Sequence, residues 1–118
     1  MLNLPPNISI LLCCQPVNMR WSFKGLMGII RNTFRDDPKN GTLFLFFNRA
    51  RNRVKILYWD NDGFAIWYKR IERGTFRLPP RLSDDAAVHI TRAQLAMILE
   101  GIDLLQGKRR KRYSEINL

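Results

Sequence analysis

The sequence is poor in the residues that most often build catalytic and metal sites. It contains one histidine, His89, and its two cysteines, Cys13 and Cys14, are adjacent. Neighbouring side chains on a strand point to opposite faces, so these cysteines are badly placed to share a metal ion or to form a disulfide. We expect two reduced thiols, as in a reducing cytoplasm, and no metal or other cofactor.

Long apolar runs are also missing. The run at residues 8–14 is far shorter than the roughly 20 residues that a membrane span requires. No basic segment precedes it, as one would in a secretory signal. We therefore expect a cytoplasmic protein without membrane contact, and we interpret this run as a buried strand, apolar on both faces.

Acidic residues are scarce, and their arrangement does not favour an enzyme. Three acidic pairs occur, namely Asp36-Asp37, Asp60 with Asp62, and Asp84-Asp85. Paired carboxylates can hold the metal ions of a nuclease, but the first pair precedes a helix-ending proline, the second flanks a turn and the third lies in a polar loop. A glycine-rich phosphate loop is absent. We expect no catalytic residues.

Positive charge is what the chain has in excess. Twenty Lys and Arg against ten Asp and Glu give a formal net charge of +10. Such an excess attracts nucleic acids, acidic proteins and anionic lipids, and it says little about the fold. Residues 108–118 contain five of these bases and one acid, and the remainder of the chain is also basic.

Apolar periodicity and turn residues predict one small α+β domain at residues 1–107, followed by a basic, disordered tail at 108–118. The expected order is β-α-β-β-β-α, with strands at 8–14, 42–47, 53–59 and 64–70. The short loops favour an antiparallel meander packed on two helices. One helix is expected between the cap Ser22 and Pro38, with Phe23 in its apolar stripe. The other is expected from the capping box of Thr91 and Gln94 to Gly107.

The hairpin of 53–59 and 64–70 sorts its side chains onto two faces. The first face is nearly all apolar and is expected to pack on the helices; it carries Val54, Ile56, Tyr58, Ala65, Trp67 and Lys69. The second mixes bases with apolar side chains, and it carries Arg53, Lys55, Leu57, Trp59, Phe64, Ile66, Tyr68 and Arg70. This mixed face is either a platform for phosphates and unpaired bases or a second apolar cluster covered by basic side-chain stems.

Two basic segments are candidates for binding nucleic acid. Arginines around the loop at 48–52 can reach a groove or a row of phosphates, and the tail can bind through charge alone. Alternatively, the loop is basic only to stay soluble, and the tail binds an acidic partner or only aids solubility. The candidate residues are Arg49, Arg51, Arg53, Lys55, Arg70, Lys108, Arg109, Arg110, Lys111 and Arg112.

A series of motifs gives the chain a family resemblance. Near the N-terminus they are Leu4-Pro5-Pro6, Gln15-Pro16-Val17-Asn18-Met19-Arg20 and Phe23-Lys24-Gly25-Leu26. In the centre they are Lys55-Ile56-Leu57-Tyr58-Trp59-Asp60, Asp62-Gly63-Phe64, Trp67-Tyr68-Lys69-Arg70 and Glu72-Arg73-Gly74. Over roughly residues 4–105 the chain resembles the TnpB-type, Orf2-like accessory proteins of the IS sixty-six (IS66) insertion sequences. These are unrelated to the RNA-guided nuclease that shares the TnpB name.

The resemblance implies a protein encoded beside a separate transposase and needed for efficient transposition, with strand cleavage assigned to the transposase. It brings no catalytic or ligand residues. One departure is Asn18, where the family usually has Asp, so either a salt bridge has become a neutral hydrogen bond or this copy is partly degenerate. We expect a non-catalytic accessory protein that binds DNA, with RNA as the other candidate ligand. The alternative is an adaptor for the transposase or for other element-encoded proteins.

Overall fold

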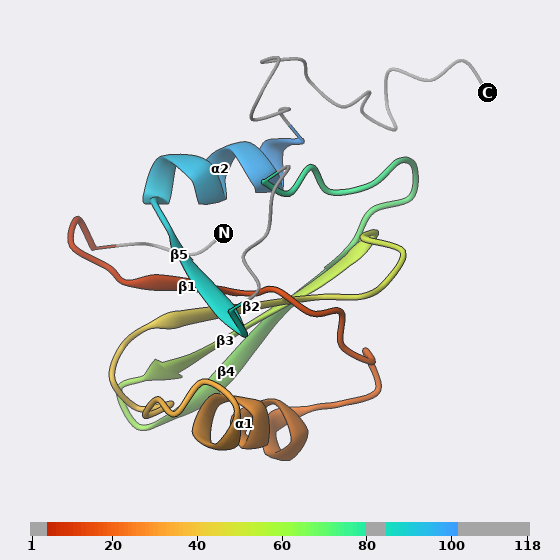
Figure 1. The fold of residues 1–118 in the computed structure, drawn as a ribbon. Helices are drawn as coiled ribbons and strands as arrows, with labels where there is room; N and C mark the ends of the chain where they lie inside the picture. The colour runs from red at the N-terminus through yellow and green to blue at the C-terminus, as the bar shows by residue number, and fades with distance from the viewer. Residues whose placement is uncertain (1–4, 80–84, 102–118) are drawn as a thin grey trace.

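The computed structural model of the chain describes residues 5–79 and 85–101, which form a sheet between two helices (Figure 1). The strands are β1 (Ile10–Cys13), β2 (Leu43–Phe47), β3 (Arg53–Asp60), β4 (Gly63–Arg70) and β5 (Ala87–Ile90), and the helices are α1 (Phe23–Asn32) and α2 (Arg92–Glu100). The strand order is β4-β3-β2-β1-β5. The α+β class is thus confirmed, and β2, β3 and β4 form the expected antiparallel meander. The basic tail lies outside the described residues.

Strand β5 is absent from the predicted order. It pairs antiparallel with β1, whose other neighbour, β2, runs parallel to it. The segment Ala87–Ile90 contains His89 and only four residues, too few to show an alternating pattern. Its hydrogen-bonding partner is more than seventy residues away in the chain, so local sequence gives little sign of the strand.

The two helices cover opposite faces of the sheet, whereas the sequence placed both on one face (Figure 1). Leu95, Ile98 and Leu99 of α2 pack on the face that carries Val54 and Ile56. Leu26 and Ile30 of α1 instead pack on the mixed face, against apolar residues of the inner strands. Because both faces are covered, all residues of β1 and β2 are buried, as the apolar run in β1 predicts.

The helix termini agree with the sequence in part. In α2, the Thr91 hydroxyl accepts from the Gln94 amide and the Gln94 side chain accepts from the Thr91 amide, so the capping box is confirmed. That helix ends at Gly101, which has a left-handed φ of 78°, and not at Gly107. In α1, the Ser22 side chain makes no capping hydrogen bond, and Phe23 is 42% exposed and lies outside the core. No helix in the described segments is long and apolar enough to cross a membrane.

Candidate nucleic-acid interface

The mixed face of the β3–β4 hairpin divides into an apolar end and a basic end. Towards the turn at 61–62, Leu57 lies opposite Ile66 and both belong to the core under α1. Towards the other end, Lys55 lies opposite Tyr68 and Arg53 lies opposite Arg70. The expectation of a covered apolar cluster therefore holds at the end towards the turn, and the expectation of a nucleic-acid platform stays a prediction for the other end. Leu57, Phe64 and Ile66 form the covered apolar cluster, and the end beyond the reach of α1 keeps its bases.

Lys55 corrects one of the sequence predictions, because its ammonium group is not available to a phosphate. The residue is only 7% exposed. Its Nζ donates hydrogen bonds to the backbone carbonyls of Met19 and Trp21, each at 2.7 Å, and lies 4.8 Å from the centre of the Tyr68 ring. A buried ammonium requires such partners. We therefore remove Lys55 from the candidate contacts and assign it the role of fastening the segment before α1 to the sheet.

The loop between β2 and β3 is shaped by Asn48. Its Oδ1 accepts from the backbone amides of Asn52 and Arg53, both at 3.0 Å, and its Nδ2 donates to the Asn52 side chain at 2.7 Å. Arg51 takes a left-handed conformation with φ of 57°. That conformation is uncommon for a residue with a side chain. The Asn48 side chain therefore supplements the backbone hydrogen bonds of the loop, such as that from the Arg51 amide to the Asn48 carbonyl at 3.0 Å, and the arginines are presented from a defined backbone.

Replacing Asn48 with alanine tests this role. We expect the free energy of unfolding to fall by about 2 kcal/mol, because two backbone donors lose their acceptor in a partly buried site. Asn48→Asp keeps the acceptor, loses the Nδ2 donor and adds a negative charge beside the loop arginines, and it is expected to lose about half as much. Urea unfolding followed by circular dichroism measures both. Equal losses in the two variants would show that the Oδ1 hydrogen bonds are not what holds the loop.

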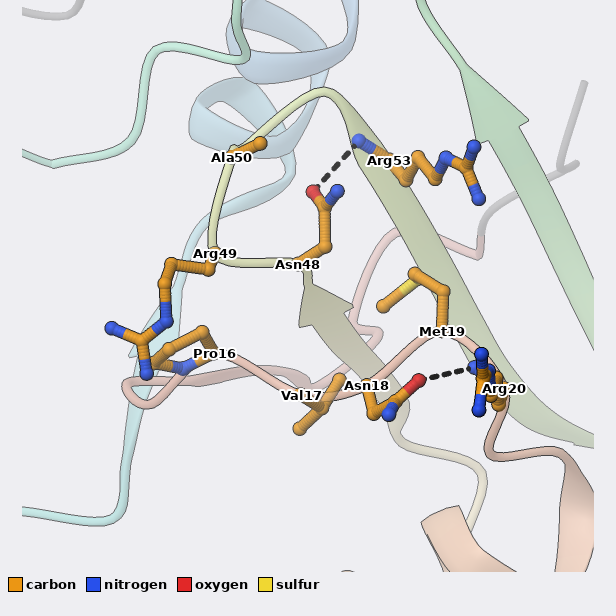
Figure 2. A pocket seen from close by; sticks show the side chains of 9 residues that line it. All are labelled: Pro16, Val17, Asn18, Met19, Arg20, Asn48, Arg49, Ala50 and Arg53. Carbon is orange, nitrogen blue, oxygen red and sulfur yellow. Dashed lines mark hydrogen bonds between the residues drawn. The ribbon is translucent and has the colours of Figure 1, made fainter.

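A pocket of about 530 Å³ lies between this loop and the segment that precedes α1 (Figure 2). Three arginines line it: Arg20 from the segment before α1, Arg49 from the loop and Arg53 from the start of β3. None of the described lining residues is acidic. In Figure 2 the guanidinium of Arg49 lies beside Pro16, and Arg20 stands at the opposite end of the turn, so the charges are spread along the pocket's edge. We call these three residues the arginine rim.

The rim contains part of the predicted set and one residue that the sequence argument did not select. Arg49 and Arg53 are brought together as expected, and Arg20 joins them because Lys55 holds its backbone neighbours. The only local sign of Arg20 was its position in the Gln15-to-Arg20 motif. Arg51 instead lines a smaller hollow of about 190 Å³ beside Cys13 and Cys14. The candidates Lys108, Arg109, Arg110, Lys111 and Arg112 lie outside the described residues.

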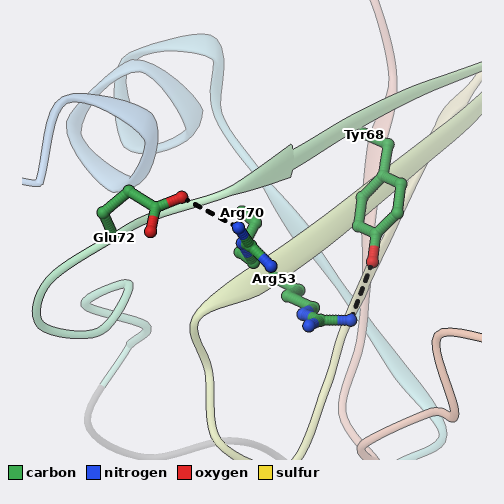
Figure 3. A network of polar contacts seen from close by, with 4 residues as sticks. All are labelled: Arg53, Tyr68, Arg70 and Glu72. Carbon is green, nitrogen blue, oxygen red and sulfur yellow. Dashed lines mark hydrogen bonds and ion pairs between the residues drawn. The ribbon is translucent and has the colours of Figure 1, made fainter.

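Arg70 extends the basic surface along the edge strand β4. It lies directly opposite Arg53 in the β3–β4 register, an arrangement of like charges that is unfavourable without an anion nearby. Arg70 Nη2 is 3.2 Å from Glu72 Oε1, and Arg53 Nη1 is 3.4 Å from the Tyr68 hydroxyl (Figure 3). The Arg70–Glu72 pair is exposed and hence contributes little. Both guanidinium groups keep donors free to meet an anionic ligand, since each has five.

Asn18 shapes the turn that carries Arg20. Its Oδ1 accepts from the backbone amide of Arg20 at 2.9 Å, and its carbonyl accepts from the amide of Trp21 at 3.0 Å. An aspartate could accept the same hydrogen bond, so the turn does not require the amide form. The difference is one of charge. Asn18 also lines the pocket, and a carboxylate there would cancel part of the positive charge of the arginine rim.

The pair Asp36-Asp37 and the two cysteines have hydrogen-bonding partners within the described part of the chain. Asp36 accepts from the Asp37 amide and from the Asn40 side chain, and Asp37 accepts from the Lys39 amide. Among residues 5–79 and 85–101, no group of three or more His, Cys, Asp or Glu side chains is placed to hold a metal ion. Cys13 and Cys14 are buried and form no disulfide, and burial raises the pKa of Cys13, which disfavours the reactive thiolate.

Comparison of the sequence with known proteins shows which family it resembles. The family model described as "IS66 Orf2 like protein" matches residues 8–109. The uncharacterized protein y4jC of Sinorhizobium fredii is 29% identical over 103 residues, which cover 87% of this chain and 86% of the relative. The uncharacterized protein y4hO of the same organism is 30% identical over 97 residues, which cover 82% and 83%. No solved structure matches the chain.

Proposed function

Because this chain belongs to the IS66 Orf2-like family of insertion-sequence accessory proteins, we propose that it is a non-catalytic factor that binds nucleic acid during transposition. The arginine rim and Arg70 bind phosphates, and the tail at 108–112 adds further charge. DNA is the expected ligand, and RNA is tested beside it. The work of cutting and joining strands falls to a separate, element-encoded transposase, and binding takes place in the cytoplasm.

The observation that carries this proposal is the meeting of Arg20, Arg49 and Arg53 around one open pocket that no described acidic residue lines. Each guanidinium presents five donors and matches a phosphate better than a point charge would. Spread along an edge instead of converging on one point, the three charges suit successive phosphates of a strand. The net charge of +10 would bring a polyanion to this surface from a distance.

The salt dependence of binding tests the proposal. Fluorescence anisotropy is measured with labelled DNA and RNA over a series of salt concentrations, for the full chain and for the variant with Arg20, Arg49 and Arg53 all changed to alanine. Three lost phosphate contacts should reduce the slope of log K against log salt by about 2 to 3. Affinity at low salt should fall by a factor of about 100 or more.

Two full-length controls separate the body of the protein from its tail and from charge in general. Arg92→Ala removes one exposed charge on α2, on the opposite face of the sheet, and should leave binding nearly unchanged. In the second control, the five bases at 108–112 are replaced by neutral residues. This change should weaken binding, and the triple substitution should have the same effect with or without it. If wild-type binding is absent, or flat across the salt series, the proposal is wrong.

The exposed aromatic side chains favour a second candidate function, that of an adaptor for the transposase. Trp21, Phe23 and Tyr68 are large apolar side chains on the surface, and aromatic residues with arginine are enriched at interface hot spots. Co-purification with the cognate transposase after nuclease treatment would support this function. Binding to nucleic acid with no retention of the transposase would rule it out.

A further inference from the structure

Two exposed aromatic residues stand at the basic end of the mixed face. Trp21 is 46% exposed and Tyr68 is 47% exposed. They come from distant parts of the chain, yet both meet the same buried lysine. Lys55 Nζ lies 2.7 Å from the Trp21 carbonyl and 4.8 Å from the centre of the Tyr68 ring. The fold therefore brings the backbone of Trp21 and the ring of Tyr68 to the same lysine, and it leaves both side chains about half exposed.

Each ring is held by specific neighbours. A Cβ atom added at Gly25 of α1 would lie 3.0 Å from Trp21 Cβ and 3.1 Å from its Cγ, so the indole rests on the helix backbone where glycine leaves room. The Tyr68 ring is held by the Lys55 ammonium and by the contact of its hydroxyl with Arg53 Nη1 at 3.4 Å. Side chains that are ordered before a ligand arrives lose less entropy when it binds.

The charges around the rings indicate which ligand would use them. Arg20 immediately precedes Trp21, and Arg53 and Arg70 form the neighbouring pair to Tyr68 on the same face of the hairpin (Figure 3). Exposed aromatic rings beside a basic track are the combination that binds single strands, because unpaired bases stack on the rings while arginines neutralise the backbone. In a duplex, by contrast, the faces of the bases are already stacked on one another.

We infer that this surface selects single-stranded nucleic acid, with unpaired bases stacked on Trp21 and Tyr68 and the phosphates of the same strand bound by Arg20, Arg53 and Arg70. The inference rests on the proposed function and names the ligand class of its site. It assigns different tasks to neighbouring residues. The arginines supply affinity for any nucleic acid, and the two rings supply the preference for an unpaired strand.

The test compares one sequence as single-stranded DNA, as duplex DNA and as single-stranded RNA, by fluorescence anisotropy at fixed salt. The wild-type protein should bind one or both single strands more tightly than the duplex. Trp21→Ala and Tyr68→Ala should each weaken single-strand binding by about ten-fold or more. Both should change duplex binding by no more than about two-fold, since the rings do not stack on paired bases.

Tyr68→Phe and Trp21→Phe are the matched controls, because each keeps an aromatic ring. Tyr68→Phe should bind single strands within about two-fold of wild type, which a role limited to the hydroxyl would not allow. Quenching of tryptophan emission by the single strand gives an independent readout. It should be strong in the wild type and largely lost in Trp21→Phe, although Trp59 and Trp67 remain.

The outcomes separate the inference from the proposed function. If the protein binds nucleic acid but prefers the duplex, or if the Trp21→Ala/Tyr68→Ala double variant binds single strands as the wild type does, the inference is overturned and the proposed function stands. If no nucleic acid binds to the wild type, both fail. If the double variant folds, binds single strands normally and loses only the transposase, the two rings belong to a protein interface and the inference is overturned.

Discussion

Replacing Phe46 with alanine is expected to lower the free energy of unfolding by about 4 kcal/mol. Phe46 has no exposed surface and belongs to the core between the sheet and α1. Its ring stacks on Phe34, with 6.1 Å between centroids and 8° between planes. β2 is hydrogen-bonded to a strand on each side, so the backbone cannot move inward to fill the space that the ring leaves.

Urea unfolding monitored by circular dichroism measures this loss, and Phe23→Ala is its matched control. Phe23 was expected in the apolar stripe of α1, but it is 42% exposed in the structure. Its removal should change the free energy of unfolding by no more than about 0.5 kcal/mol, as is usual at surface sites. Similar losses for the two variants would contradict the position of α1 on the mixed face.

Replacing Lys55 with alanine is expected to cost about 3 kcal/mol, the second largest effect. Two hydrogen bonds from a charged donor are lost at once, together with the contact between the ammonium group and the Tyr68 ring. The loss is not larger because Trp21 is exposed and Met19 is partly exposed. Water can therefore reach the two backbone carbonyls that lose the Lys55 donor. Chemical denaturation again gives the magnitude.

Lys55→Met separates the packing role of this side chain from its hydrogen bonds. Methionine is a similarly long apolar side chain and needs no buried charge, so stability should recover to within about 1 to 2 kcal/mol of the wild type. The segment before α1 still loses its two hydrogen bonds to the sheet. Arg20 belongs to this segment and should therefore become less ordered. Nucleic-acid affinity should therefore stay low in Lys55→Met. Full recovery of both stability and affinity would show that Lys55 does not position the arginine rim.

Local sequence patterns predict the antiparallel strands well because they depend on near neighbours. The hairpin of β3 and β4 closes through the two residues Asn61 and Asp62, as the turn chemistry predicts. The alternation of side chains then determines which residues share a face, whatever lies beyond the sheet. It cannot tell which face a helix will cover, and for that reason the mixed face allowed two interpretations. The covered apolar cluster is found at one end, and the nucleic-acid platform stays a prediction for the other.

The candidate site was harder to predict because its residues come from separate segments. The strand pattern predicts that Lys55 is an exposed base. Its ammonium group is buried only because the segment before α1 passes over it. The sequence indicates only that Arg20 lies in a turn. The position of that segment in the fold brings Arg20 to the pocket that Arg49 and Arg53 also line. A basic residue becomes a ligand contact or a structural tie according to what the fold places over it.

The composition, the turn residues and the two-residue alternation were enough to determine a basic α+β domain with a three-stranded meander and the capping box of α2. These features arise from interactions between residues close in the chain. The addition of β5 beside β1, the placement of α1 and α2 on opposite faces, the burial of Lys55 and the assembly of the arginine rim were decided only by the tertiary structure. Each of them depends on contacts between distant segments, whose free energy is realised only when the whole sheet has formed.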